Sequence, residues 1–338
     1  MGSSNKSGLA ESLTDMNGDP GKQPLVSIGL PVYNGSRWID DSIRSFVNQT
    51  YQNIELIICD NCSTDSTPSI CETWAANDSR IRFFRNEKNI GLIPNHNLVF
   101  RHARGEYFVW GSYDDLHHAE SISSMVAELQ ARPELVLVYT RAESIDEFGT
   151  ISTEKEMHVP LNSDSVSTRA KSLLADFAPS ETIFYGVMRR EAMQKTSLLP
   201  NCFGADFIFL LQLVTLGKMD KIPRVLFYRR VHANNVITSQ EQPWRFRSDW
   251  SGKLIFPQWR ILTEGMKCAL RAKISIGEKI RLLSTVVRFS WNRKSLLKTE
   301  LGFAWYYTKQ RLRGNNPTLS PADRQRHQEQ IQSNGLTH

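Results

Sequence analysis

Polar side chains follow four short apolar runs of the chain, and their types could bind a ligand and a metal ion. The four polar segments are Pro31–Asn34, Asp60–Asp65, Arg85–Gly91 and Ser112–Asp115. Carboxylate oxygens are the ligands that hard divalent cations prefer, and a guanidinium can bind an anionic group. Each segment alone has a structural explanation, since Asn34 could form a turn and Asp65 could cap a helix. Four such segments together predict a functional site.

The apolar runs themselves predict buried strands, because they are short and each leads into a polar segment. Strands are expected at Leu25–Leu30, Ile54–Cys59, Ile81–Arg85, Tyr107–Trp110, Glu134–Thr140 and Arg224–Arg230. Apolar residues at helical spacing predict helices at Ser36–Gln49, Thr67–Ala76, Asn95–His102 and Phe207–Leu216. This alternation indicates an α/β fold with an open, mixed, mostly parallel sheet flanked by helices, whose ligands bind beyond the carboxyl ends of the strands.

The chain resembles family 2 of the nucleotide-sugar glycosyltransferases from about Leu25 to Ser239. The resemblance rests on the string VSIGLPVYNGSRWIDDSIRSFVNQTYQNIELIICDNCSTDST, which contains the family's Pro-x-Tyr-Asn, NQTY and Asp-x-x-Ser-x-Asp segments in order. It implies a GT-A type fold and the transfer of a sugar from a nucleotide diphosphate to a hydroxyl acceptor.

The resemblance also implies which residues bind the nucleotide. Pro31, Tyr33 and Asn34 would border the base and the ribose. Asp60 would accept a hydrogen bond from the imide of the base, and Arg85 would lie close to the nucleotide. An imide implies a pyrimidine, so a UDP-sugar is the favoured donor. The full predicted nucleotide site comprises Pro31, Val32, Tyr33, Asn34, Asp60, Asn61, Arg85, Gly91, Asn95, Ser112, Tyr113 and Asp114.

Asp114, Asp115 and His232 are the predicted ligands of Mn²⁺ or Mg²⁺. A transferase without a Gly-Lys-Ser/Thr loop usually needs such a cation for two phosphates. By resemblance, Asp114 matches the second aspartate of the family's Asp-x-Asp, and Ser112 replaces the first, which weakens the contact expected there. Asp115 either assists or caps the following helix. His232 is included because LFYRRVHANNVITS resembles the family's Tyr-Arg-x-His segment, whereas an isolated histidine is more often structural.

Asp206 is the predicted catalytic base. The reaction needs a group that takes the proton of the acceptor hydroxyl as its oxygen attacks the anomeric carbon. The stretch GADFIFLLQLVTLGKMDKIPRVLFYRRVH resembles the family's acidic helix start, in which Asp206 matches the aspartate and Ala205 replaces a frequent preceding acid. The structural alternative is a carboxylate that only favours the helix dipole. No second acid is identified as a nucleophile, so a single displacement with inversion is expected.

Composition is that of a folded protein. Hydrophobic residues make up 40% of the chain, and no apolar run approaches the roughly 20 residues that cross a bilayer. Residues 1–24 lack the apolar core of a secretory signal and are predicted to be a disordered leader, so we expect a cytoplasmic protein.

Five cysteines without a dense framework indicate free thiols; a redox or zinc role for Cys59 and Cys62 is the alternative.

The carboxyl-terminal region is strongly basic. Residues 251–314 carry fourteen Lys or Arg against three acids, interspersed with apolar and aromatic residues. We predict a basic amphipathic helical region over 241–314 and a disordered tail over 315–338. The helices would contact an anionic membrane surface from the cytoplasmic side, close the core with solvated basic faces, or do both. No nucleic-acid-binding signature accompanies them, so no nucleic acid partner is expected.

Residues 25–240 are thus predicted to form a GT-A glycosyltransferase domain, with a nucleotide half at 25–130 and an acceptor half at 131–240. The predicted function is inverting transfer from a nucleotide-diphosphate sugar to a hydroxyl of a saccharide or lipid-linked saccharide, in surface polysaccharide or glycolipid synthesis. The alternatives are a non-catalytic nucleotide-sugar or carbohydrate-binding protein, suggested by Ser112 and Ala205, and a membrane-surface scaffold.

Overall fold

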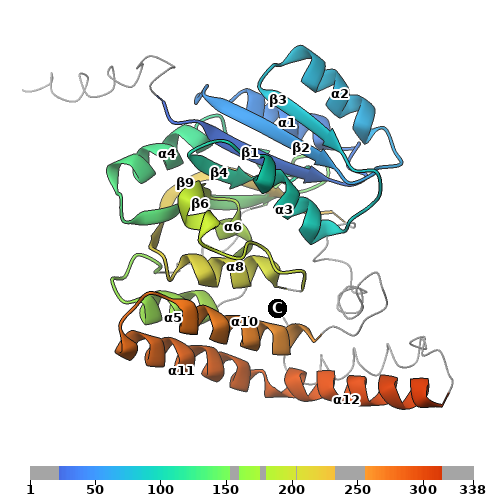
Figure 1. Ribbon diagram of the computed structural model, residues 1–338. Helices are drawn as coiled ribbons and strands as arrows, with labels where there is room; N and C mark the ends of the chain where they lie inside the picture. The colour runs from blue at the N-terminus through green and yellow to red at the C-terminus, as the bar shows by residue number, and fades with distance from the viewer. Residues whose placement is uncertain (1–22, 153–159, 176–179, 203, 233–255, 314–338) are drawn as a thin grey trace, which may run out of the picture. The chain divides into compact units, whose positions relative to one another are not determined.

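The computed structural model describes residues 23–152, 160–175, 180–202, 204–232 and 256–313. These residues form two compact units, which divide after Phe289. The sheet belongs to the first unit (Figure 1). Most of the predicted leader, the predicted tail and residues 241–255 of the predicted basic region lie outside the described residues.

The amino-terminal part of the first unit alternates strands and helices. Its elements are β1 (Val26–Val32), α1 (Ile39–Val47), β2 (Ile54–Asp60), α2 (Thr67–Asn77), β3 (Ile81–Arg85), α3 (Leu92–His102) and β4 (Tyr107–Trp110). All residues of β1 and β2 are buried, as strands of a parallel sheet covered on both faces are. The four strands predicted here are confirmed, and α3 begins three residues before the predicted Asn95.

The remaining elements of this unit are more irregular in length. They are β5 (Leu116–His117), α4 (Ser121–Ala131), β6 (Leu135–Ile145), β7 (Ile151–Ser152), α5 (Val166–Ala175), α6 (Ser180–Phe184), β8 (Val187–Arg189), α7 (Arg190–Gln194), α8 (Ala205–Leu213) and β9 (Lys218–Arg230). The strand predicted at 134–140 is the first half of β6, and the one predicted at 224–230 is the second half of β9.

The strands form one mixed sheet in the order β3-β2-β1-β4-β8-β6-β9-β5, with β7 paired to β6. The two longest ladders, β6 with β9 and β1 with β2, are parallel. β8 is antiparallel to both β4 and β6, and β5 is antiparallel to β9. The predicted fold class, a mixed and mostly parallel sheet flanked by helices, is confirmed.

Helices cover both faces of the sheet. Residues of α1, α2 and α4 share one apolar core with β1 and β2, whereas α3, α5, α6 and α8 share a second core with Trp110 of β4. Gly29 of β1 lets α3 approach closely, because a Cβ there would lie 2.7 Å from a methyl group of Val99. The close packing of helix on strand fixes the loops that leave the sheet.

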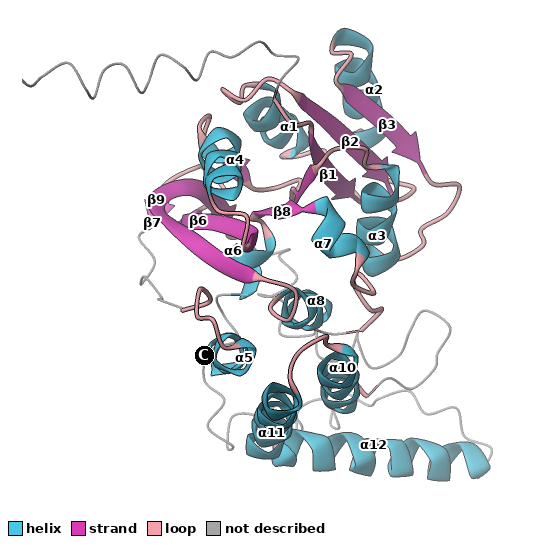
Figure 2. Cartoon of the chain, turned by 60° about the vertical axis from the view of Figure 1, so that its left-hand side comes forward, coloured by secondary structure: helices cyan, strands magenta, loops and turns pink. Residues whose placement is uncertain are grey.

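The carboxyl-terminal helices are α10 (Pro257–Arg271), α11 (Ile276–Asn292) and α12 (Lys294–Leu312). α10 packs beside α8 (Figure 2). Ile261 and Ala269 of α10, with Leu282 and Val286 of α11, belong to the same core as α8. These two helices therefore close the core, as one of the sequence-based alternatives predicts. Within the described residues, no helix is both long enough and apolar enough to cross a membrane.

Candidate active site

The carboxyl ends of β1, β2 and β3 bring the first predicted site residues together. The strand register places Val32 beside Asp60 and Asp60 beside Arg85. β4 runs parallel to β1 on its other side, so the segment from Ser112 to Asp115 leaves the sheet at the same edge. Four loops that are far apart in the sequence thus leave the sheet at one edge, as predicted for a binding site in such a fold.

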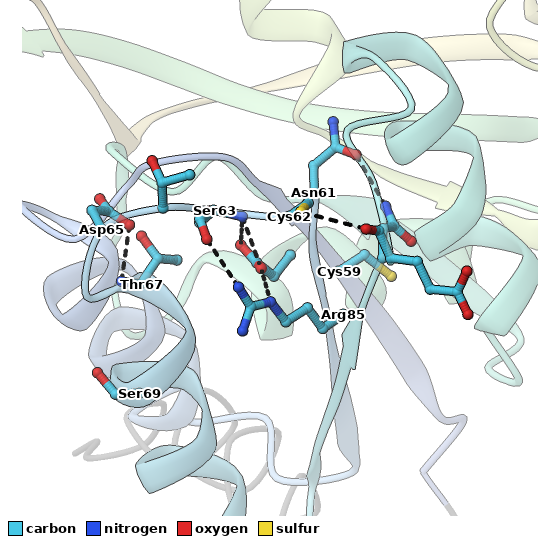
Figure 3. Close-up of polar contacts among 12 residues, drawn as sticks. Cys59, Asn61, Cys62, Ser63, Asp65, Thr67, Ser69 and Arg85 are labelled. Atoms are coloured by element: carbon cyan, nitrogen blue, oxygen red, sulfur yellow. Dashed lines mark hydrogen bonds and ion pairs between the residues drawn. The ribbon is translucent and has the colours of Figure 1, made fainter.

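Asp60 is a fully buried carboxylate held by backbone and guanidinium donors. The Ser63 amide lies 3.3 Å from Oδ1 and 3.1 Å from Oδ2, and Arg85 Nε lies 3.3 Å from Oδ2. Arg85 Nη2 also donates to the Ser63 carbonyl at 3.0 Å (Figure 3), so Arg85 contacts both Asp60 and Ser63. About half of the Arg85 side chain is exposed, which keeps this cation accessible to an anionic ligand.

Asn34 connects the β1 loop to the β2 loop. Its backbone is left-handed, with φ 51°, a conformation that asparagine tolerates better than most residues. Its amide donates to Ser63 Oγ at 2.8 Å, and its Oδ1 accepts from the Thr64 amide at 2.9 Å. Pro31 and Val32 are buried at the end of β1, whereas the following Tyr33 is exposed. The turn therefore presents Tyr33 at the edge where the other loops meet.

A network of asparagines fixes the loop between β3 and α3. Asn61 Oδ1 accepts from the Ile90 amide at 2.9 Å and from Asn86 Nδ2 at 3.1 Å. Asn86 Nδ2 also donates to Asn95 Oδ1 at 3.0 Å, and Asn95 Nδ2 donates to the buried Cys59 carbonyl at 2.8 Å. Gly91 precedes α3 with φ 92°, which only glycine adopts readily. Asn61, Gly91 and Asn95 thus fix the conformation of this loop, because their side-chain or backbone groups form hydrogen bonds within the protein.

Asp114 and His232 form the closest pair of predicted metal ligands. Asp114 Oδ2 lies 2.9 Å from His232 Nε2, and both side chains are almost fully buried. The Ser112 hydroxyl donates to Asp114 Oδ1, and Ser112 O accepts from Ser42 Oγ at 2.7 Å. Ser112, which replaces the expected aspartate, therefore orients the carboxylate. The neighbouring Tyr113 ring packs against the backbone at Gly35, where a Cβ would lie 2.7 Å away.

The spacing of this pair fits two ligands of one divalent cation. Two donors at right angles about an ion, each at about 2.1 Å, lie about 3 Å apart, close to the observed separation of Asp114 Oδ2 and His232 Nε2. Ions such as Mg²⁺ take few protein ligands and complete their shell with phosphate oxygens and water. Among the described residues no set of three such side chains is assembled, so substrate oxygens would have to complete the shell.

Asp115 is held by the end of β9. The Arg230 amide donates to Asp115 Oδ1 at 2.8 Å, and Arg230 Nε donates to the Asp114 carbonyl at 2.9 Å. Burial, and then the charge of Asp114, raise the pKa of Asp115 well above its ordinary value, although the Arg230 hydrogen bond opposes this. The helix-capping alternative for Asp115 is wrong, because the next element is strand β5 and α4 begins only at Ser121.

Trp38 and Arg230 contact the predicted metal site but were not among the residues predicted from sequence. The Trp38 ring is buried and lies 4.1 Å from the His232 ring, centroid to centroid. Arg230 Nη1 reaches from the aspartates to the Asp146 carbonyl at 3.2 Å, which ties the turn after β6 to the site. The position of Arg230, two residues before His232, is the sequence signal that could have indicated it. Trp38 lies within the helix predicted at Ser36–Gln49, where an apolar side chain gives no separate signal of a site.

Asp206 lies in the first turn of α8 and is partly buried. The helix begins after Gly204, whose left-handed backbone (φ 70°) turns the chain into it. A carboxylate at this end of a helix is favoured by the helix dipole. α8 begins at Ala205, two residues before the predicted Phe207, so Asp206 does lie at the start of a helix, while its role as base remains a prediction.

The cysteines are free thiols. Cys59 is buried at the end of β2, and burial raises the pKa of its thiol to about 12. A thiol with that pKa is neither a ready nucleophile nor a ready zinc ligand. Cys62 lies in the loop with φ 64° and donates to the Glu87 carbonyl. The geometry therefore gives no support to the redox or zinc alternative.

Comparison with known proteins gives consistent matches. A family model described as glycosyl transferase family 2 matches residues 27–197. A glycosyltransferase of Haemophilus influenzae is 28% identical over 222 residues, covering 62% of this chain and 67% of that protein. Chondroitin synthase of Escherichia coli is 36% identical over 128 residues, but these cover 38% of this chain and only 18% of the synthase.

Solved structures share the fold at low sequence identity. S. aureus TarS (residues 1–349), in complex with UDP-GlcNAc, superposes with a TM-score of 0.59 and 14% identity, covering 79% of this chain and 72% of the TarS chain. The same protein in complex with UDP gives a TM-score of 0.58 at 14% identity, covering 78% of this chain and 70% of that chain.

Proposed function

Because the chain belongs to glycosyl transferase family 2 and is therefore a glycosyltransferase of the GT-A fold, we propose that it transfers a sugar from a nucleotide-diphosphate sugar, with UDP as the favoured nucleotide. The acceptor is a hydroxyl of a saccharide or lipid-linked saccharide. The observation that carries the proposal is the buried Asp114–His232 pair at the sheet edge that also holds Asp60 and Arg85.

The donor would bind along this edge. Asp60 would accept from the imide of a pyrimidine, in which case the ligand must displace or share the donors that now hold this carboxylate. Arg85 would lie close to the nucleotide, where its partly exposed guanidinium can neutralise anionic charge. The S. aureus TarS structures with UDP and UDP-GlcNAc support a nucleotide sugar as the kind of donor, because the fold is shared.

Asp114 and His232 would hold Mn²⁺ or Mg²⁺, with Asp115 beside them. The nitrogen donor favours Mn²⁺, since Mg²⁺ prefers oxygen ligands. When bound, such an ion supplies positive charge that stabilises a leaving diphosphate. The protein's own contribution is to orient the two donors, through the Ser112 hydroxyl on Asp114 and the Trp38 ring on His232.

Asp206 would act as the base in a single displacement. It would take the proton of the acceptor hydroxyl while that oxygen forms a bond to the anomeric carbon and the bond from this carbon to the diphosphate oxygen breaks. The electron pair leaves with the nucleotide diphosphate, and the configuration of the sugar carbon inverts. The position of Asp206 in the first turn of α8 supports the presence of a carboxylate there, because the helix dipole favours it.

The reaction would serve surface polysaccharide or glycolipid synthesis at the cytoplasmic face of a membrane. The match to a chondroitin synthase supports a saccharide acceptor, although the matched part is a small fraction of that protein. Turnover of a UDP-sugar separates this proposal from a non-catalytic sugar-binding protein, which would bind the donor without transfer.

The decisive experiment is titration calorimetry with UDP, with and without Mn²⁺, on the wild type, Asp114→Ala and the surface control Asp41→Ala, whose side chain is exposed on α1. We expect Mn²⁺ to increase the affinity of the wild type for UDP. With Mn²⁺ present, Asp114→Ala should bind UDP at least about tenfold more weakly than the wild type, and Asp41→Ala should bind it as the wild type does. UDP binding that does not respond to Mn²⁺ would contradict the metal site. Failure to bind UDP, dTDP, GDP or CMP would contradict the nucleotide-sugar function.

A further inference from the structure

Helix α11 carries apolar residues on two faces, whereas a helix that only closes a core needs one. Its inner face carries Leu282 and Val286, both at most 1% exposed and packed into the core around α8. The Phe289 ring stacks on Phe207 of α8 at 5.6 Å, which fixes the rotation of the helix about its axis. A surface helix ordinarily has one apolar stripe and a polar outer face.

The outer face of α11 is apolar as well. Ile276, Ile280 and Val287 are 77%, 62% and 47% exposed. At 3.6 residues per turn these three side chains fall within about 40° around the helix axis, roughly a third of a turn away from Leu282 and Val286. The three exposed residues therefore lie on one side of the helix, and we call this set the outer stripe.

Basic side chains lie beside the outer stripe. Arg281 and Arg288 are exposed and lie about a third of a turn from both the stripe and the core-facing side. Lys279, on the other side of the stripe, reaches back to the Leu270 carbonyl at 3.0 Å. Only Arg281 of these three has a carboxylate partner in the described structure, namely Glu278. Long basic side chains can keep their charge at the lipid headgroups while an apolar stripe enters the acyl boundary.

We propose that the outer stripe of α11 lies on an anionic lipid surface. Residues 256–289, which contain α10 and nearly all of α11 in the first unit, carry seven Lys or Arg against two acids, a charge that such a surface attracts. A second copy of the chain is the less suitable partner, because the same flanking arginines would face each other across a symmetric contact. This inference does not rest on the proposed catalysis, although a lipid-linked acceptor would lie at the same surface.

The test is flotation of the full-length protein with vesicles of equal parts phosphatidylglycerol and phosphatidylcholine, and with vesicles of phosphatidylcholine alone. We expect binding to the anionic vesicles that falls with added salt. Ile280→Glu should reduce the partition coefficient at least about tenfold. Ile151→Glu, the same change at a 56% exposed isoleucine of β7, is the matched control and should bind as the wild type. Arg288→Gln should weaken binding roughly fivefold.

All three substituted side chains are exposed, so we expect each variant to retain the fold. Thermal unfolding of each variant checks this. Equal loss of binding in Ile280→Glu and Ile151→Glu would overturn the proposal, as would equal binding to anionic and neutral vesicles. Sedimentation that shows a dimer in the wild type and a monomer in Ile280→Glu, without vesicle binding, would assign the stripe to contact between copies instead. UDP binding measured on the same variants keeps a failure here separate from a failure of the nucleotide site.

Discussion

At the residue scale, the contacts of His232 explain how a histidine far along the chain is held beside Asp114. Its Nε2 faces the carboxylate and its ring packs at a tilt against Trp38, a residue at the start of α1 that is only 7% exposed. Arg37 lies over the same indole, with its Cζ 4.6 Å from the ring centroid, and it pairs with Glu147 at 2.7 Å. The indole therefore contacts both a cation and the imidazole, and it limits the rotation of His232.

We predict that Trp38 acts as a positioning residue for His232. Trp38→Leu keeps apolar bulk but removes the ring, and it should weaken Mn²⁺-dependent UDP binding about tenfold or more, as loss of an orienting partner does. Trp38→Phe should recover most of this loss. UDP binding without Mn²⁺, measured by calorimetry on the same proteins, should change little in either variant. A merely structural role would instead lower both kinds of binding together.

Sequence indicated the residues whose types match a motif position. It missed Trp38 and Arg230, which lie in the same strings but act through contacts that only the folded chain brings together. Asp114 and His232 could be named because each lies in its own short motif. Trp38 and His232 are far apart in the sequence, and no local periodicity predicts their contact. Asp115 was open to misreading as a helix cap because strand β5 has only two residues, too few for a period to be visible.

At the scale of elements, the buried carboxylate of Glu55 ties β2 to its neighbours. Oε1 accepts from Ser27 Oγ of β1 at 2.6 Å and from the Arg104 amide at 2.7 Å, and Oε2 accepts from Arg82 Nη1 of β3 at 2.8 Å. Burial alone would raise the pKa of Glu55, but the hydrogen bonds from Ser27, Arg104 and Arg82 outweigh it and the pKa is lowered. Three parallel strands are thus connected at the end of the sheet opposite to the site.

We predict that Glu55→Gln destabilises the fold by roughly 2 kcal/mol at neutral pH, because it removes charge-assisted hydrogen bonds from a buried network. A lowered folded-state pKa gives stability that is fully present above the unfolded value near 4.5 and is lost as pH falls through the folded value. The difference between wild type and Glu55→Gln in urea unfolding should therefore shrink below pH 4.5. Glu72→Gln, at an exposed glutamate of α2, serves as the control. A difference that is the same at both pH values would contradict this account.

Elements were predictable where apolar periodicity is long enough to be read. β1 and β2 are buried along their whole length and gave clear runs, and α8 gave a long apolar stretch. β5, β7 and β8 have two or three residues and exist because β9 and β6 pair with them, which only the folded chain determines. The full lengths of β6 and β9 were missed for a related reason, since their pairing continues through polar residues.

At the scale of the whole molecule, α10 and α11 belong to the folding unit that contains the sheet. Gly265 of α10 faces Val286 of α11, where a Cβ would lie 2.8 Å from a methyl group, and Cys268 Sγ donates to the Leu211 carbonyl of α8 at 3.4 Å. Glu278 of α11 accepts from the Ser167 amide at the start of α5 at 2.9 Å. Composition showed a basic, mixed region but could not tell which apolar residues turn inward, because α11 has apolar residues on two faces.

Substitutions on the two faces of α11 should change the free energy of unfolding by different amounts. Leu282→Ala removes a fully buried side chain and should lower the free energy of unfolding by about 2–5 kcal/mol, with a lower temperature for the main transition. Ile280→Ala, two positions earlier on the outer stripe, should change it by less than about 0.5 kcal/mol. Circular dichroism during thermal unfolding measures both. A main transition that is unmoved by Leu282→Ala would mean that α11 unfolds apart from the sheet. If α11 does unfold with the sheet, then a lipid surface that binds the outer stripe of the native helix must also stabilise the domain that holds Asp114 and His232.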